Sequence, residues 1–373
     1  MGYLKNRMMM GLGMICTGLL MGCSGQTAEP KPLTIEDIEA LNPKQIWSID
    51  HAGDLYFSHL GYESEVLENG NIVFADRQLP AIVVISENGE YVKHVRSGRG
   101  PGEIQDAYFF TKDRTGNIYT YDQNNDKILT YDKEFDHVSD IIPKEYESNG
   151  ILKVFPMGEE NEYLLQMSSS EYLWDESKQR QINLVQYNSE NNTFGEVLAL
   201  NAQPYALLKI DGNVMGASKV PYAPGNIISY DFRNNSLFTY DTGSDLIAEI
   251  DADFDTLNTI SLNLPTEEIS TTELDSMEAS YDMEEQWKTI KEALPEDKAP
   301  ADKMIYHKGI FWLKSNMEAK TEMWLVVNEE GVVRNVVHLP KESMLTHIDD
   351  DHLGVRMNDV TFALFTNPVS ETE

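Results

Sequence analysis

The sequence predicts an all-β fold in which six similar four-stranded sheets close into a ring, a six-bladed β-propeller. Three observations lead to this prediction. Two segments that begin at Gly70 and Gly116 repeat one pattern of turns and strands with an offset of 46 residues. Weaker copies follow through most of the remaining chain, and only one segment has a helical composition. A period of roughly 40 to 50 residues is typical of a propeller blade.

The two clearest repeats show how each blade begins. A Gly-Asn pair at 70–71 predicts a tight turn, because both residues tolerate positive φ. The β-branched and aromatic run 72–76 predicts a strand, and 82–85 predicts a second one after a polar turn. Residues 116–122 and 128–131 repeat this order. A sheet that is apolar on both faces cannot bury itself alone, so we expect the repeats to stack around an axis.

Four more strand pairs complete the count. They are 162–166 with 182–187, 236–241 with 246–251, 309–313 with 323–327, and 352–356 with 361–365. No strand follows the last pair, so we expect Gln45–Phe57 to complete that sheet and remove the exposed edges of the ring. Five or seven blades remain alternatives, since residues 200–232 are irregular.

One segment between the fourth and fifth blades interrupts the β pattern. Apolar residues recur at helical spacing over about 266–295, which predicts a short insertion of one or two helices. Ser270 supplies an N-cap with Glu273 in the first turn, and Pro295 ends the helical pattern.

The N-terminus carries an export signal. Lys5 and Arg7 precede an apolar run, Met8–Met21, that is too short to span a bilayer comfortably. The sequence Leu-Met-Gly-Cys at 20–23 resembles the lipobox of bacterial lipoproteins, which implies cleavage before Cys23 and acylation of that residue. We therefore divide the chain into a lipoprotein signal peptide (1–22), a tether (23–43) and a single propeller domain (44–373).

The residues after Cys23 bear on location. Ser24 is not the Asp associated with retention in the inner membrane, and no acidic run of a surface-export signal follows at once. This pattern favours the periplasmic side of the outer membrane over the cell surface.

One motif also carries a family resemblance. Gly98–Glu103, with the sequence GRGPGE, is followed by Asp113–Tyr119 and resembles the interblade signature of NHL-like propellers. Together with the lipobox, the chain resembles the six-bladed β-propeller lipoproteins of Bacteroidota, often grouped with NHL-like and TolB-like propellers. The resemblance implies a fold and an envelope location but little chemistry.

Composition excludes several functions. The chain has 29 basic and 62 acidic residues and a net charge of −33, which disfavours nucleic acid as a partner. Its two cysteines, Cys16 and Cys23, both lie in the N-terminal signal region, so the body has no thiolate nucleophile. The eight histidines form no HExxH motif, and no GxSxG elbow is present. We expect no metal and no cofactor.

A ligand site is expected where the interblade loops and the loops between the second and third strands meet near the axis. The candidate ligand-binding residues are Arg77, Arg99, Asn124, Tyr172 and Trp174. Arginine can hold an anionic or sugar group by paired hydrogen bonds, and loop aromatics suit stacking on a sugar or peptide. Salt bridging and loop packing are the alternative roles.

Three functions follow from this reading. The first is a membrane-anchored binding or scaffold module for protein, peptide or glycan, without evident catalysis. The second is a propeller enzyme, lactonase- or lyase-like, with an axial site assembled from several blades, because such sites escape sequence motifs. The third is a purely structural envelope component.

Overall fold

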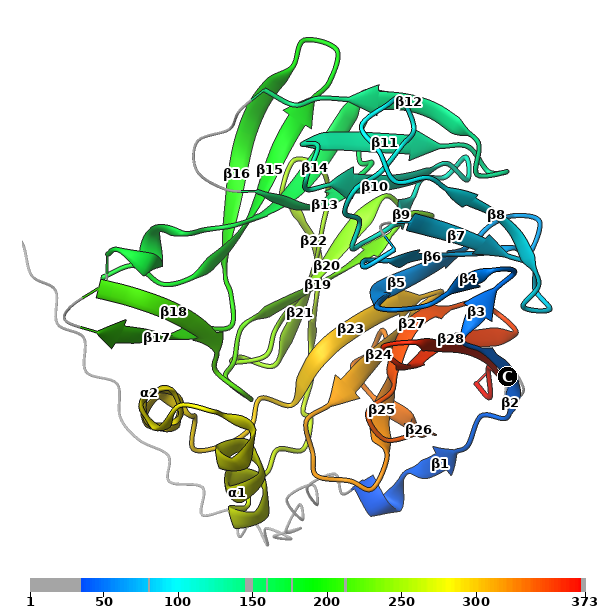
Figure 1. Ribbon diagram of the computed structural model, residues 1–373. Coiled ribbons are helices and arrows are strands. Elements are labelled where there is room, and N and C mark those ends of the chain that lie inside the picture. The colour runs from blue at the N-terminus through cyan, green and yellow to red at the C-terminus, as the bar shows by residue number, and fades with distance from the viewer. Residues whose placement is uncertain are drawn as a thin grey trace, which may run out of the picture. The chain divides into compact units, whose positions relative to one another are not determined.

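The computed structural model describes residues 35–369 except 80, 145–149, 159, 176 and 211–212. The predicted signal peptide, Cys23 and the tether up to residue 34 lie outside the described residues. Six sheets of four or five strands form the body of the unit that begins at Leu33 (Figure 1). The predicted six-bladed β-propeller is confirmed, and each of the six predicted strand pairs forms an antiparallel hairpin.

The first three blades follow one another along the chain. Blade one contains β5 (Leu60–Val66), β6 (Ile72–Asp76), β7 (Ala81–Ile85) and β8 (Tyr91–Val95). Blade two contains β9 (Thr111–Lys112), β10 (Ile118–Asp122), β11 (Lys127–Tyr131) and β12 (His137–Ile141). Blade three contains β13 (Ile151–Phe155), β14 (Glu162–Ser168), β15 (Gln181–Asn188) and β16 (Thr193–Asn201). The first strand of each blade lies nearest the axis.

Of the last three blades, the fifth and the sixth each include a strand from the N-terminal part of the described chain. Blade four contains β19 (Asn226–Asp231), β20 (Ser236–Asp241), β21 (Leu246–Ile250) and β22 (Thr256–Ser261). Blade five contains β23 (Ala301–His307), β24 (Ile310–Ser315), β25 (Glu322–Asn328) and β26 (Val333–Leu339), with β1 (Glu39–Leu41) added in parallel. Blade six contains β27 (Met344–Ile348), β28 (His352–Asn358), β29 (Thr361–Thr366) and β2 (Gln45–Ile49).

Strand β2 closes the ring. It pairs antiparallel with β29, so the predicted pairing of the N-terminal segment with the last hairpin is confirmed. The indole Nε1 of Trp47 on β2 also donates a 2.8 Å hydrogen bond to the carbonyl of Glu87 in blade one. Closure pairs β29, which would otherwise be an open sheet edge.

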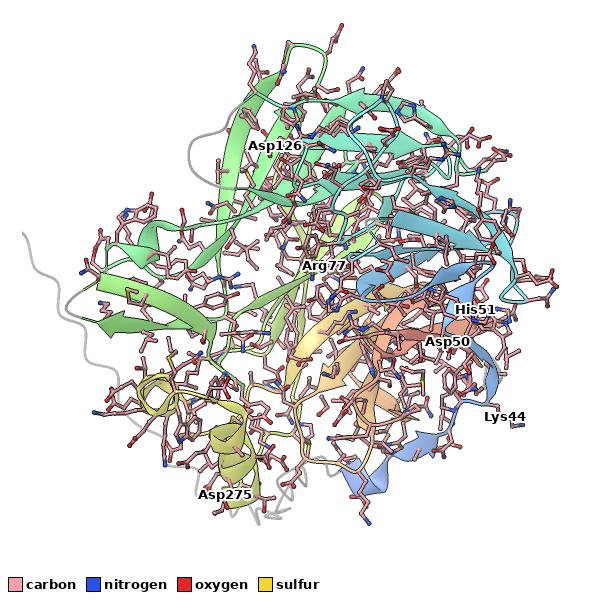
Figure 2. The ribbon with its side chains drawn as sticks, viewed as in Figure 1. Lys44, Asp50, His51, Arg77, Asp126 and Asp275 are labelled. Carbon is pink, nitrogen blue, oxygen red and sulfur yellow. The ribbon has the colours of Figure 1, made fainter. Side chains whose placement is uncertain are left out.

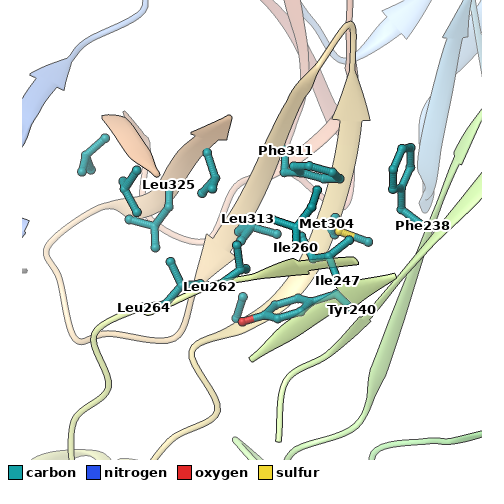
Figure 3. Close-up of a cluster of buried hydrophobic side chains, with 14 of the residues drawn as sticks. Phe238, Tyr240, Ile247, Ile260, Leu262, Leu264, Met304, Phe311, Leu313 and Leu325 are labelled. Atoms are coloured by element: carbon teal, nitrogen blue, oxygen red, sulfur yellow. The ribbon is translucent and has the colours of Figure 1, made fainter. Parts of the chain in front are cut away.

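Six apolar cores, one between each pair of neighbouring blades, hold the ring together. Within β6, Ile72 and Phe74 pack toward blade six, whereas Val73 and Ala75 pack toward blade two. Figure 3 shows the core between blades four and five, where Phe238 on β20 lies near Phe311 on β24. Because successive strand residues point to opposite faces, each blade completes two cores and is stable only beside its neighbours.

Repeated aspartates position the loops on the face where the second and third strands of each blade join, here called the B–C loop face. Asp122 ends β10 and is fully buried, and its carboxylate accepts backbone N–H bonds from Gln105 (2.8 Å) and Asn124 (3.1 Å). Asp76 ends β6 and accepts equivalent bonds from Ser58 (2.6 Å) and Gln78 (3.0 Å). In each of these two blades, the aspartate side chain therefore hydrogen-bonds both to the loop that follows its strand and to the preceding interblade connection.

The glycine-rich motif at 98–103 forms an interblade turn. The Gly100 N–H donates a 2.8 Å hydrogen bond to Glu103 Oε2. A Cβ atom at Gly98 would lie 1.9 Å from the same oxygen, so a larger residue there would displace the Glu103 carboxylate from this hydrogen bond. The positions of Gly98 and Gly100 relative to Glu103 are therefore explained by the structure of this turn, without a ligand.

Two elements extend the interblade connections. Residues 200–232, which sequence left irregular, contain an added hairpin of β17 (Tyr205–Ile210) and β18 (Asn213–Lys219). Helices α1 (Thr271–Ser280) and α2 (Glu284–Ala293) lie between β22 and β23, and Ser270 and Glu273 form a reciprocal capping box. Trp287 and Ile290 of α2 pack against the hairpin in a small separate core. The short remaining elements are η1 (Ile35–Asp37), η2 (Glu171–Leu173), β3 (His51–Ala52) and β4 (Leu55–Tyr56).

Candidate ligand-binding site

A cavity of about 570 Å³ opens on the B–C loop face. Its wall includes the first residues of innermost strands, such as Asn226 and Ala301, and loop residues such as Thr242. It also includes Tyr205 and Lys219 from the added hairpin. The volume lies within the roughly 300–1,000 Å³ range of small-molecule sites.

The cavity reverses the charge balance of the chain. Its wall carries the carboxylates of Glu63 and Asp302. The basic side chains that line it are Lys153, Arg180, Lys219, Lys303 and Lys314. Since the whole chain has 29 basic and 62 acidic residues, this concentration of cations is unusual for the molecule.

Two of the cations are paired. Lys153 Nζ lies 2.7 and 2.8 Å from the two carboxylate oxygens of Glu63. Lys314 Nζ lies 3.5 Å from Asp302, and also 3.5 Å from Glu322. These pairs use both acidic groups of the cavity wall.

The other three cations have no carboxylate within 4.0 Å among the described residues. Lys303 Nζ donates to the carbonyl oxygens of Leu345 (2.8 Å) and Tyr62 (3.2 Å) instead. The pKa of Lys303 is lowered to about 8, chiefly by burial; the charge of Glu63 opposes this shift and that of Lys153 adds to it. At neutral pH this amine is still mostly protonated, so it adds positive charge to the cavity.

Lys219 and Arg180 lie on the side of the added hairpin. Lys219 is exposed and lines the cavity. Desolvation by the surrounding protein lowers its pKa, the charge of Asp302 opposes this effect, and the charge of Arg180 adds to it. The guanidinium of Arg180 lies 4.4 Å from the centre of the Tyr205 ring and donates to the carbonyl of Gln203 at 3.1 Å. Stacking and this hydrogen bond hold the guanidinium in place.

Aromatic rings complete the wall. Tyr62 and Phe109 lie with their ring centres 6.2 Å apart, and both line the cavity. Tyr205 lines it as well and meets Tyr172 edge to face, with ring centres 6.1 Å apart. These faces offer flat apolar surface beside the cationic groups.

A narrower space of about 150 Å³ continues along the inner strands. Ser64 Oγ lies there 2.6 Å from His347 Nδ1 and 2.6 Å from Thr346 Oγ1. His347 Nε2 has no hydrogen-bond partner within the described part of the chain. Burial lowers the pKa of His347 to about 4, so the imidazole is neutral at pH 7.

None of the five candidate residues from sequence lines the cavity, and Tyr172 contacts one residue of its wall, Tyr205. Arg77, labelled in Figure 2, follows β6 and lies over the Tyr108 ring at 3.8 Å, with Asp106 3.8 Å from its Nε. Arg99 is exposed on the glycine-rich turn, and Asn124 is exposed on the loop after β10.

The two aromatic candidates lie on the long loop of blade three. Tyr172 contacts the cavity residue Tyr205, and Trp174 is 69% exposed. That any of the five binds a ligand stays a prediction.

Sequence reasoning missed the cavity cations. Lys153 and Lys303 interrupt apolar runs on the innermost strands, and an ion in such a run signals a strand that faces the axis. This signal becomes readable only after the innermost strands have been assigned. Arg180 lies in the same long loop as Tyr172 and Trp174.

The described residues offer neither a metal-binding cluster nor a membrane-spanning helix. No group of three or more His, Cys, Asp or Glu side chains there is placed to hold a metal ion. None of the helices described is both long and apolar enough to cross a membrane.

Comparisons with known proteins agree on the fold. Residues 60–207 match a family model described as a six-bladed beta-propeller. A member of the DUF4221 family from Bacteroides vulgatus superposes with a TM-score of 0.51 and 11% identity, over 87% of this chain and 97% of that one. No curated protein matches the sequence significantly.

Two further structures are more distant. A protein of Bacteroides fragilis described as exported gives a TM-score of 0.48 and 13% identity, over 88% of this chain and 99% of that one. A virginiamycin B lyase from Staphylococcus aureus gives 0.43 and 9%, over 83% and 95%. Identities this low show the fold alone.

The strand order, the six interblade cores and the family-model match define the class. The chain is a six-bladed β-propeller with a cation-rich cavity on its B–C loop face.

Proposed function

We propose that this chain is a lipid-anchored binding module of the bacterial envelope, whose propeller holds a protein, peptide or glycan without catalysing a reaction. The observation that carries the proposal is the cavity on the B–C loop face, where three cations that pair with no carboxylate of the described residues lie beside aromatic rings. Polar groups that converge on a cavity of this size are typical of a binding site.

Anchoring follows from the Leu-Met-Gly-Cys sequence at 20–23. Acyl chains on Cys23 would hold the propeller at the outer membrane, on the periplasmic side, through the tether. In cells of a bacterium that processes lipoproteins, Cys23→Ala is expected to abolish labelling by radioactive palmitate and to release the protein from the membrane fraction. Labelled and membrane-bound Cys23→Ala protein would refute the anchor.

The five residues predicted from sequence would extend the site beyond the cavity. Trp174 is exposed on a loop whose base supplies Arg180 to the cavity wall. Exposed tryptophan and arginine side chains often supply much of the binding energy of an interface. Arg77, Arg99 and Asn124 would then contact the outer parts of a larger ligand.

The binding proposal is tested with the full-length protein in detergent against a panel of glycans and peptides. At least one ligand is expected to raise the melting temperature and to bind in calorimetry, and Tyr205→Ala should weaken that binding. Tyr56→Ala removes an equally large ring that is exposed and absent from the cavity wall, so it should leave binding unchanged. Binding that ignores Tyr205 would refute this site.

An enzyme is the second candidate, favoured by the contact between Ser64 and His347 in the narrower space. Thr346 Oγ1 donates to the Gly354 carbonyl, so the Ser64 hydroxyl donates to Thr346 and accepts from His347 Nδ1 in this arrangement. For nucleophilic hydrolysis the other tautomer of His347 would have to form and the hydroxyl would have to turn towards Nδ1, which would then accept its proton. Ser64 is only 1% exposed, which limits substrate access and places this function second. Hydrolysis of lactones or esters that Ser64→Ala abolishes would support it, and wild-type protein without turnover would reject it.

A further inference from the structure

The cavity has positive charge that its own wall does not neutralise. Glu63 and Asp302 are used by Lys153 and Lys314, so the remaining cations face the space without a carboxylate within 4.0 Å in the described structure. Lys219 is exposed, but Arg180 and Lys303 are only partly exposed, and a charge held away from bulk water is costly unless an opposite charge compensates it. An anion in the cavity would supply that compensation.

The cations of the cavity act on one another. Lys219 is affected by the charges of Arg180 and Lys314, and Lys303 by those of Lys153 and Lys314, while the carboxylates of Asp302 and Glu63 oppose these effects. A ligand carboxylate among them would gain charge-assisted hydrogen bonds, and the planar guanidinium of Arg180 suits a planar carboxylate.

Neutral groups on the wall suit a polyhydroxylated ligand. The side-chain amides of Gln203, Asn226 and Asn316 line the cavity and donate through nitrogen to backbone carbonyls at 2.8 to 3.0 Å. Each amide oxygen is therefore turned away from that bond and is available to accept from a hydroxyl group. Tyr62 and Tyr205 also line the cavity, and the ring surface that they present there can pack against a sugar ring.

We propose that the cavity binds an acidic saccharide, with a sugar carboxylate held among Arg180, Lys219 and Lys303 and the sugar rings against the aromatic side chains. This inference rests on the proposed function, because it names the ligand class of the same cavity. An acidic peptide would also satisfy the cations, and its backbone N–H groups could donate to the amide oxygens. A saccharide carries its hydroxyl donors and its flat ring faces on the same unit as the carboxylate, so it can meet the cations, the amide oxygens and the aromatic side chains together.

The test compares trigalacturonate with its methyl ester, which has the same rings and hydroxyls but no charge. In calorimetry with the full-length protein in detergent, the acid should bind at least about tenfold more tightly, the value of one charge-assisted hydrogen bond. Added salt should weaken only the binding of the acid. Equal affinity for the two trisaccharides would overturn the proposal.

Variants locate the site. Lys219→Gln and Arg180→Gln should each weaken trigalacturonate binding about tenfold. Lys178→Gln makes the same charge change in the same loop as Arg180, at an exposed side chain 3.5 Å from Glu171, and should keep the wild-type affinity. Undiminished binding by Lys219→Gln and Arg180→Gln would overturn the assignment.

Peptide controls separate this inference from the binding function. Preference for a tri-glutamate peptide over trigalacturonate, with loss in Lys219→Gln, would overturn the saccharide class and leave the cavity as a binding site. If neither acidic probe binds, the inference fails, whereas the proposed function fails only if every panel ligand ignores Tyr205.

Discussion

Acid is expected to destabilise the propeller through His347. This imidazole lies on β27, buried against β5, and hydrogen-bonds through Nδ1 to Ser64. Burial lowers its pKa from 6.5 to about 4. The charge of Asp349 opposes the shift, whereas Lys112, His352 and His307 reinforce it.

The sign of the effect follows from proton binding. The unfolded chain protonates this imidazole below about pH 6.5, but the folded chain does so only below about pH 4. Between these values the unfolded state binds more protons, so stability falls as the pH falls. A difference of about 2.5 pKa units corresponds to about 3 kcal/mol of unfolding free energy, of which about 2.5 kcal/mol is lost by pH 4.5.

The assay is denaturant unfolding at pH 7 and pH 4.5 for wild type and His347→Gln. The variant keeps a hydrogen-bonding group near Ser64 but does not titrate. It should therefore lose about 2.5 kcal/mol less than wild type on acidification. His51→Gln is the control, because His51 is exposed beside Asp50 (Figure 2) and should retain the wild-type loss. Equal losses in wild type and His347→Gln would refute the reasoning.

Two further predictions concern packing. Leu325→Ala leaves a cavity at a fully buried position in the core of Figure 3, so it should lower the unfolding free energy by about 3 kcal/mol in denaturant unfolding. Leu257 is 57% exposed, so Leu257→Ala should change the unfolding free energy by less than about 0.5 kcal/mol in the same assay. Gly354→Ala would place Cβ 2.1 Å from His347 Cε1 and should cost about 2 kcal/mol, but Gly216→Ala meets nothing within 4 Å and should cost none. Equal melting temperatures for the two alanine-for-glycine variants would contradict the contact.

Local pattern was enough to predict the blades. In blade one, a Gly-Asn turn followed by alternating or continuous apolar residues predicted β6 and β7 within a residue or two of their observed bounds. These strands are readable because their turns need particular backbone angles and both of their faces are buried. The same reasoning predicted that Gln45 and its neighbours would pair with the last hairpin, because an open ring leaves an exposed sheet edge.

The candidate site was only partly predictable. The face of the ring was expected from the loops, and the long loop with Tyr172 does border the cavity through Tyr205. The innermost strands carry the remaining groups, and they were not assigned from sequence. The added hairpin, which supplies Lys219, lay in the segment that showed no clear pattern.

The sequence by itself determined the repeated hairpins, the acidic charge of the chain and the lipobox-like segment, because each depends on neighbouring residues or on composition. It predicted six blades but left five or seven open, and the sheets of the structure settled the number. Only the tertiary structure decided which charges meet. Glu63 and Lys153 are 90 residues apart, yet they form an ion pair at the axis because the ring brings the first strands of different blades together. Lys303 lies on the first strand of blade five. Among the described residues no carboxylate lies within 4.0 Å of its amine, and the order of residues alone does not reveal this, because it depends on which side chains the ring brings together.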